Sequence, residues 1–516
     1  MIVKFIVIGI YFAILLLLGA LASRRIRDER DYIVGGKKLG FWLVSFSARA
    51  TGESAWLILG LSGLAYKLGL VALWVVLGET LGVAICWLFM TKRFKRLTDR
   101  YDSSTVPDYL TDRVHSRSMA IRWVSAIALT VFVSIYVSAQ LHATGQAFEG
   151  FLQVDYHIGV AVGFVVVLVY IVSGGFIAVV WSDLFQGALM LAALIGLPIF
   201  GLALLGGPSE LFRVLAADDP GLLNAFGPAG FTTKSVVMIV GLVAVGVGYL
   251  GSPQVFVRFI SIADTDEIDK GRWVAISYTI IAGLGAVFTG LCARAVFFTQ
   301  NKATWVLLAA NGFEKSQQSF TFLANTLPDL FAGMMIAVVL SAIMSTADSL
   351  LILAASSVVH DTYRKLTSRV IDEHALTRLS RYATLGLAFF ALAITYAVAS
   401  IYGTNTSIYW YVIFGWSGIA ATFCPVIILS LVWRGLTPQG MVTGMVSGFF
   451  SVLALKALAQ SHASSLAAIT RFLNTLDDVL VISTLIAMLL AVVVSRLTTV
   501  DRPAVDADFA YVESQR

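Results

Sequence analysis

Long apolar runs separated by short charged stretches make up most of this chain. Most runs hold about 20 residues, the length that a helix needs to cross the hydrocarbon core of a bilayer. Each run therefore predicts one membrane-spanning helix. We predict thirteen of them, near residues 3–22, 41–66, 69–91, 119–148, 156–174, 184–206, 235–256, 274–299, 330–360, 379–401, 408–433, 440–459 and 476–497.

Small and polar residues interrupt three of these runs. The second run contains the hydroxyl-rich stretch 47–54, and the ninth contains a similar stretch at 342–349. Glycine and proline interrupt the seventh at Gly246, Gly248, Gly251 and Pro253. Hydrocarbon cannot satisfy hydroxyl, carboxylate or free carbonyl groups, so such stretches persist only where they face one another, a cavity or an ion.

Interrupted helices would begin two groups of five spans, spans two to six and spans seven to eleven. Because five is odd, the two repeats have inverted topology, and matching interruptions in inverted repeats are typical of a transporter binding site. The alternative is that glycine and proline merely allow close helix packing. The predicted divisions are 1–40 for the first helix and its loop, 41–206 and 235–433 for the repeats, 440–497 for two C-terminal helices and 498–516 for a tail.

The composition favours the same class of protein. Of the 516 residues, 58% are hydrophobic and 13% are charged, against about 25% charged in soluble proteins. We therefore expect an all-α polytopic protein of the plasma (inner) membrane. The three cysteines are isolated in apolar segments, which argues against a disulfide framework. We assign the net charge of +5 to loops that set topology, not to nucleic-acid binding.

The loops alternate between basic and nearly uncharged, and this difference predicts the orientation. The basic loops hold lysine and arginine clusters near 24–38, 92–117, 258–272, 364–378 and 434. Because basic loops remain in the cytoplasm, the N-terminus is predicted to be outside and the C-terminus in the cytoplasm. An odd number of spans requires the same arrangement. The apolar run from Phe5 to Ala22 is too long for a cleavable signal.

A candidate sodium site lies where the second and ninth spans carry their polar residues. Ala342, Ser345 and Thr346 have i, i+3 and i+4 spacing and share one face of the ninth span. Ala50 and Glu53 would add backbone carbonyls from the broken second span, and transporters bind sodium through such oxygens. The alternative for the two hydroxyls is bonding back to the preceding helical turn.

Several segments resemble the sodium:solute symporter family, and most closely its sodium/proline symporter branch. The resemblance runs nearly from end to end. The segments that carry it are 31–40, 47–56, 106–110, 181–183, 248–254 with Arg258-Phe259, and 341–361. It implies thirteen spans, a five-plus-five inverted repeat and sodium-driven uptake by alternating access.

The resemblance also implies roles for individual residues. The family's sodium site would consist of Ala50, Glu53, Ala342, Ser345 and Thr346. Asp183 matches an acid that in some family members helps to bind a second sodium ion or forms part of its exit path. Independently of the resemblance, Asp348 lies one turn beyond Ser345 and could complete a second cation site with Asp183 and Ser349.

Departures from the proline branch bear on the transported solute and leave the expected sodium coupling unchanged. That branch has an aspartate at the position of Gly52, a tryptophan at Val245 and a serine at Asp348, although Tyr249 and Pro253 remain. Proline or a similar small amino acid is the favoured solute. A sugar, a monocarboxylate, a pantothenate-like acid and a quaternary amine remain open, as does a symporter-like sensory domain.

Buried acids and amides supply the candidate solute contacts. Glu53 is a candidate cation ligand, proton site or partner of a solute ammonium group, or else a local partner of Arg49. Glu79 is either a solute ligand or an acid held by helix packing. The full predicted set of solute contacts is Glu53, Glu79, Gln140, Tyr249 and Pro253.

The sequence argues against an enzyme, because its six histidines are scattered and no His-Glu-x-x-His helix is present. Interrupted helices with a single closed ion site favour a carrier over a channel. The expected partners are sodium as coupling ion, a small-molecule solute and the lipid bilayer. We expect no organic cofactor, and the oligomeric state is left open.

Overall fold

The computed structural model describes residues 1–26, 29–310, 315–367, 372–461, 464–476, 478–499 and 502–515. In these ranges the protein is helical, and its one strand-like contact is a bridge between Leu39 and Ile262. Among the described residues, eleven helices are long and apolar enough to cross a membrane. The predicted class, a polytopic all-α membrane protein, is confirmed. Arg27 and Arg369, members of the predicted basic loops, lie outside the described residues.

The first part of the chain contains the first predicted interruption. The second span is broken after Gly52, and a new helix begins at Trp56. The helices of this part are α1 (Ile2–Ser23), α2 (Glu29–Val34), η1 (Gly35–Lys37), α3 (Phe41–Gly52), η2 (Trp56–Leu61), α4 (Ser62–Leu68), η3 (Gly69–Ala72), α5 (Leu73–Ile85), η4 (Cys86–Met90), α6 (Thr91–Arg100), α7 (Val106–Arg113), α8 (Ala120–Leu152) and α9 (Tyr156–Leu205).

Helix α9 agrees with the prediction of two helices in this region but not with the predicted loop between them. Its two parts meet at a kink at Gly175, a non-helical residue with φ 52° and ψ −155°. A side chain at this position would meet Tyr32 at 2.5 Å, so the bend needs glycine for its dihedral angles and for its space. The predicted start of the sixth span, near residue 184, is therefore wrong, because helix already runs from Gly175.

The second part of the chain contains the other predicted interruption. A 3₁₀ segment and two non-helical residues, Gly251 and Ser252, divide the seventh span. The helices of this part are α10 (Pro208–Asp218), η5 (Pro220–Leu223), α11 (Thr233–Ala244), η6 (Val245–Leu250), α12 (Pro253–Ser261), α13 (Thr265–Gln300), α14 (Lys302–Ala310), α16 (Ser319–Ala324), α17 (Asp329–Ser356), η7 (Ser357–Tyr363), α18 (Arg364–Leu366), α19 (Glu373–Tyr402) and α20 (Ile408–Val432).

Five short or peripheral elements complete the chain. They are α21 (Pro438–Ala459), η8 (Ser464–Leu466), α22 (Ala467–Leu476), α23 (Leu480–Leu497) and α24 (Arg502–Ser514). The count of eleven spans takes Trp56–Arg100 as one helix, omits the 12-residue α3, and sets aside Tyr156–Val169 as a shorter apolar helix. Thirteen spans and an inverted repeat stay predictions.

The helices divide into a central group and a peripheral group. In the most apolar part of each helix, 78% of residues are buried in α13 and α17 and 89% in α20. The corresponding share is 28% in both α1 and α21. The central helices surround the two interruptions, while the peripheral helices leave apolar side chains on the outside, where lipid covers them.

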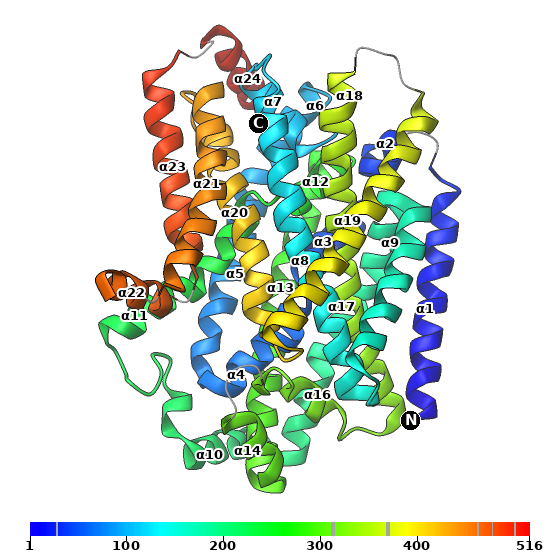
Figure 1. Ribbon diagram of the computed structural model, residues 1–516, viewed down its shortest axis with the longest axis vertical. Helices are drawn as coiled ribbons and strands as arrows, with labels where there is room; N and C mark the ends of the chain where they lie inside the picture. The colour runs from blue at the N-terminus through cyan, green and yellow to red at the C-terminus, as the bar shows by residue number, and fades with distance from the viewer. Residues whose placement is uncertain are drawn as a thin grey trace.

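Short helices lie at both ends of the bundle. Helices α2, α6, α7, α18 and α24 lie at the upper end of Figure 1 together with the C-terminus. Helices α10, α14 and α16 lie at the lower end, where the chain also begins. The described basic loops therefore share one end of the molecule with the C-terminus, and the N-terminus lies at the opposite end.

Candidate functional site

The break in the second span is stabilised by side chains around it. Gly52 ends α3, and Glu53 follows with φ −104° and ψ 84°. Gln140 of α8 accepts a hydrogen bond from the backbone nitrogen of Ala55 (3.3 Å) and donates one to Oγ of Ser54 (3.2 Å). The indole nitrogen of Trp56 donates to the carbonyl of Gly52 (3.1 Å). These bonds satisfy backbone groups that the interruption would otherwise leave unpaired.

A group of oxygens joins α3 to α17 just before this break. Oγ of Ser345 donates to the carbonyl of Ala50 (3.0 Å), and Oγ1 of Thr346 donates to the carbonyl of Thr51 (3.1 Å). Both hydroxyls also lie within hydrogen-bond distance of the carbonyl of Ala342, at 3.3 and 3.2 Å. We call these five residues the oxygen group.

Four of the five predicted sodium ligands belong to this oxygen group. The fifth, Glu53, makes none of these bonds, and its carboxylate turns toward Arg49. Thr51 is a member that the sequence did not suggest. Ser345 and Thr346 thus bond back to their own helix, as the local alternative proposed, and also reach the facing helix.

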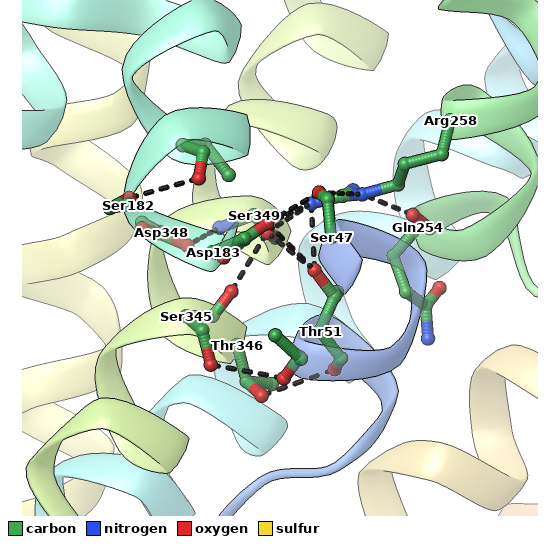
Figure 2. A network of polar contacts seen from close by, with 12 residues as sticks. Ser47, Thr51, Ser182, Asp183, Gln254, Arg258, Ser345, Thr346, Asp348 and Ser349 are labelled. Carbon is green, nitrogen blue, oxygen red and sulfur yellow. Dashed lines mark hydrogen bonds and ion pairs between the residues drawn. The ribbon is translucent and has the colours of Figure 1, made fainter. Parts of the chain in front are cut away.

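A second polar network lies beside the oxygen group, around Arg258 of α12 (Figure 2). Nε of this arginine donates to Oγ of Ser47 (3.0 Å), and Nη2 donates to Oγ1 of Thr51 (2.7 Å). Nη2 also contacts Oγ of Ser349 (2.5 Å) and Oδ2 of Asp183 (3.2 Å). The Arg258 side chain therefore connects α3, α9, α12 and α17, and it is fully buried with its partner Asp183.

This network occupies the place of the predicted second cation site. Of its three predicted members, Asp183 and Ser349 both contact the Arg258 guanidinium. Asp348 instead accepts a hydrogen bond from the backbone nitrogen of Ser349 (2.5 Å). Oδ1 of Asp183 is buried and accepts no hydrogen bond from the described residues. A cation of the protein itself thus already pairs with part of this site.

A third polar cluster lies at the end of α3 and consists of Arg49, Glu53, Glu79 and Tyr249. The Arg49 guanidinium forms ion pairs with Glu53 and with Oε1 of Glu79, the latter at 2.5 Å. The Tyr249 hydroxyl donates to the same Oε1 of Glu79 (2.7 Å) and contacts the carbonyl of Gly52 (3.2 Å). The local Arg49–Glu53 pair is present, but a second acid has joined it.

Tyr249 also accounts for the small residue at position 52. A Cβ atom on Gly52 would lie 2.7 Å from Cε1 of Tyr249. The tyrosine ring therefore fills the space that a side chain would need, and an aspartate at this position requires the ring to move. Among the other predicted solute contacts, Gln140 lies at the break, whereas Pro253 begins α12 on the far side of the second interruption.

Comparison with known proteins shows the family of this chain. The sequence model of the sodium:solute symporter family matches residues 32–448. The chain belongs to the sodium:solute symporter family. It is 34% identical to the high-affinity proline transporter PutP of Bacillus subtilis over 441 residues, which cover 85% of this chain and 89% of PutP. It is 32% identical to a sodium/proline symporter of Staphylococcus aureus over 451 residues, 87% of this chain and 85% of that protein.

The family assignment agrees with the fold. A solved structure of a sodium-coupled sialic acid symporter, in a substrate-bound outward-open state, superposes on this chain with a TM-score of 0.78. The match covers 96% of this chain and 98% of that protein at 18% sequence identity. This likeness shows a shared fold, and the predicted resemblance to sodium:solute symporters is confirmed.

Sequence reasoning did not find the central place of Arg258. It lies near a basic loop and was counted among the residues that set topology. The available signal was its position directly after the predicted seventh span, five residues beyond Pro253 and three before α12 ends at Ser261. An arginine at that depth requires a buried partner.

Proposed function

We propose that this protein couples the inward movement of sodium to the uptake of a small amino acid, with proline as the leading candidate. The observation that carries this proposal is the oxygen group, in which the Ser345 hydroxyl contacts the carbonyl of Ala50 across two helices. Proline transporters and sodium/proline symporters are among the relatives of this chain. Because the family consists of symporters, the proposed class for this protein is a carrier and not an enzyme.

Sodium would bind between four residues of the oxygen group and the start of the break in the second span. The ligands would be the carbonyls of Ala50 and Ala342 and the hydroxyls of Ser345 and Thr346, with a carbonyl of Glu53 as the fifth. A hydroxyl that now donates to a carbonyl needs only to turn its proton away to offer a lone pair to a cation. The chemistry of these donors suits sodium, which takes oxygen ligands from a broken helix and its facing helix.

The second cation site would depend on Arg258. Asp183, Asp348 and Ser349 could bind another sodium ion when the guanidinium withdraws from Asp183 and Ser349. Until then the arginine supplies the positive charge that a buried carboxylate requires. The state with this network formed would therefore carry one sodium ion.

The orientation follows from the distribution of charge. The end of the molecule that holds α6, α7 and α24 would face the cytoplasm, and the N-terminus would lie outside. This arrangement places the basic loops on the side that they occupy in most membrane proteins. The membrane would be the plasma (inner) membrane, where the inward sodium gradient and the membrane potential drive accumulation.

Uptake by the purified protein tests this function. Proteoliposomes that contain the full chain are given labelled L-proline with an inward sodium gradient, and the control uses an equal potassium gradient. We expect accumulation above equilibrium with sodium and none with potassium. Equal uptake under both gradients would contradict sodium coupling, and sodium-driven uptake of a different solute class alone would contradict the assignment of an amino acid.

A further inference from the structure

The cluster at the end of α3 combines one basic and two acidic side chains. With both acids ionised, Glu53 and Glu79 supply two negative charges against the one positive charge of Arg49. The three side chains are at most 2% exposed. Arg49 projects from the side of α3 opposite to Ser47 and Thr51, because residues two apart in a helix face away from each other, and Glu53 pairs with Arg49 from the break that follows α3. The cluster is therefore separate from the Arg258 network.

Each of the two acids keeps one oxygen without a donor. Arg49 contacts the Oε1 atoms of Glu53 and Glu79, and Tyr249 donates to the same atom of Glu79. The Oε2 atoms of both acids are buried and accept no hydrogen bond from the part of the chain that the structure describes. An unpaired carboxylate oxygen in a dry interior is costly, and a donor that carries a positive charge removes that cost best.

We propose that Oε2 of Glu53 and Oε2 of Glu79 together receive the protonated amino group of the transported solute. This inference rests on the proposed function and narrows it to solutes with at least one ammonium N–H. Arg49 is a positioning residue, since it holds both carboxylates by their Oε1 atoms and leaves Oε2 available. One bound ammonium group brings the charge of the cluster from −1 to zero.

The surroundings of the cluster suit an amino acid with an apolar body. Tyr249 packs against Trp416 of α20, with ring centroids 5.0 Å apart. Glu53 lies at the break of α3, Glu79 on α5 and Tyr249 on η6, so both interrupted segments and a neighbouring helix contribute. An ammonium group here would lie within one helical turn of the carbonyls of Ala50 and Thr51. Solute and sodium would thus bind on the same turn of α3.

This chemistry separates the solute classes. A secondary or primary ammonium group donates N–H bonds and carries the missing charge. A quaternary amine has the charge but no N–H to donate. A monocarboxylate or pantothenate-like acid would bring a further negative charge, and a sugar would leave the cluster at −1, so neither offsets the buried charge.

Competition with matched ring compounds tests the inference on the natural chain. Labelled L-proline uptake under a sodium gradient is measured with unlabelled N-methylproline, N,N-dimethylproline or tetrahydrofuran-2-carboxylate. The first keeps one N–H, the second keeps the charge without N–H, and the third lacks both at nearly unchanged size. We expect N-methylproline to inhibit the uptake of labelled L-proline. The other two compounds should need at least about tenfold higher concentrations for the same inhibition, because each lacks a charged hydrogen bond.

Two matched variants add a second test. Glu79→Gln should raise the KM for L-proline at least about tenfold and leave the sodium-dependent thermal shift unchanged. Glu149→Gln, at an exposed acid of α8, should change neither. Loss of the sodium shift in Glu79→Gln, with KM unchanged, would overturn the inference, because the cluster would then bind the ion. If Glu79→Gln does not fold, the competition series decides.

The outcomes distinguish this inference from the function on which it rests. Sodium-driven proline uptake inhibited equally by all three analogues contradicts the ammonium receptor alone. Absence of sodium-driven uptake for every amino acid contradicts the proposed function and the inference with it. Weak competition by both compounds that lack N–H, together with a raised KM in Glu79→Gln, supports the inference.

Discussion

Arg258 brings a full positive charge into the middle of four helices, and the neighbouring residues are arranged around it. Its guanidinium contacts Asp183 of α9, Ser349 of α17 and the hydroxyls of Ser47 and Thr51 on α3. Removing one member of a buried ion pair leaves the other charge without compensation. The stability of the network therefore depends on Arg258 and Asp183 together.

We expect Arg258→Met to lower the free energy of unfolding by about 3–5 kcal/mol, because Asp183 is then left as a buried, unpaired carboxylate. The double variant Arg258→Met with Asp183→Asn should recover part of this loss. The thermal unfolding midpoint in detergent measures both, with Arg213→Met as control, since Arg213 is in an exposed ion pair of α10. If the double variant loses as much stability as the sum of the losses in Arg258→Met and Asp183→Asn, the two residues are not paired.

At this scale the sequence predicted contacts within one helix better than contacts between helices. The shared face of Ala342, Ser345 and Thr346 follows from helical spacing and is present. The Arg49–Glu53 pair follows from i, i+4 spacing and is also present. The ion-pair partners of Glu79 and Arg258 could not be predicted in this way. Arg49 is 30 residues from Glu79 and Asp183 is 75 residues from Arg258, so no helical spacing relates the members of either pair.

The interruptions of two helices were the element-scale features that the sequence predicted best. Both breaks lie where glycine, proline and hydroxyl residues interrupt apolar runs. The division of α9 was predicted, but its form as a sharp kink without a loop was not, since glycine inside an apolar run also occurs in straight membrane helices. The contact of Gly175 with Tyr32 of α2, which distinguishes the bend from a straight helix, is not visible in the sequence.

Helix α24 was not expected in the predicted tail, and it packs on the basic end of the bundle. Asp508 forms an ion pair with Arg100 (3.0 Å) and lies within hydrogen-bond distance of Nε2 of His115 (3.0 Å). The Phe509 ring lies under the guanidinium groups of Arg113 (5.0 Å) and Arg434 (4.9 Å). These contacts connect α7 and the end of α20 through one short helix.

Phe509→Ala should therefore lower the free energy of unfolding by about 3 kcal/mol, the usual cost of truncating a buried phenylalanine. The conservative control is Phe509→Leu, which keeps apolar contact but removes the aromatic face, and it should cost less. Differential scanning fluorimetry of the full chain measures both. If Phe509→Ala unfolds at the same temperature as the natural chain, α24 does not contribute to stability.

On the scale of the whole molecule, composition and the lengths of the apolar runs were sufficient to predict a helical membrane protein. The exact number of spans was not, because broken and bent helices do not divide into runs of one standard length. The oxygen group connects α3 to α17, and Arg258 connects α12 to α3, α9 and α17. A change in either network would therefore alter how these helices pack.

The binding of sodium between α3 and α17 is the central claim, and a sodium titration of thermal unfolding tests it most directly. The natural chain should be stabilised as sodium replaces potassium at constant ionic strength, by about 2.7 kcal/mol at a hundredfold excess over Kd. Ser345→Ala should raise the apparent Kd for sodium at least about tenfold. Ser341→Ala, whose hydroxyl bonds within its own helix to Ala337 (2.8 Å), should titrate like the natural chain. An unchanged sodium titration in Ser345→Ala would contradict the account.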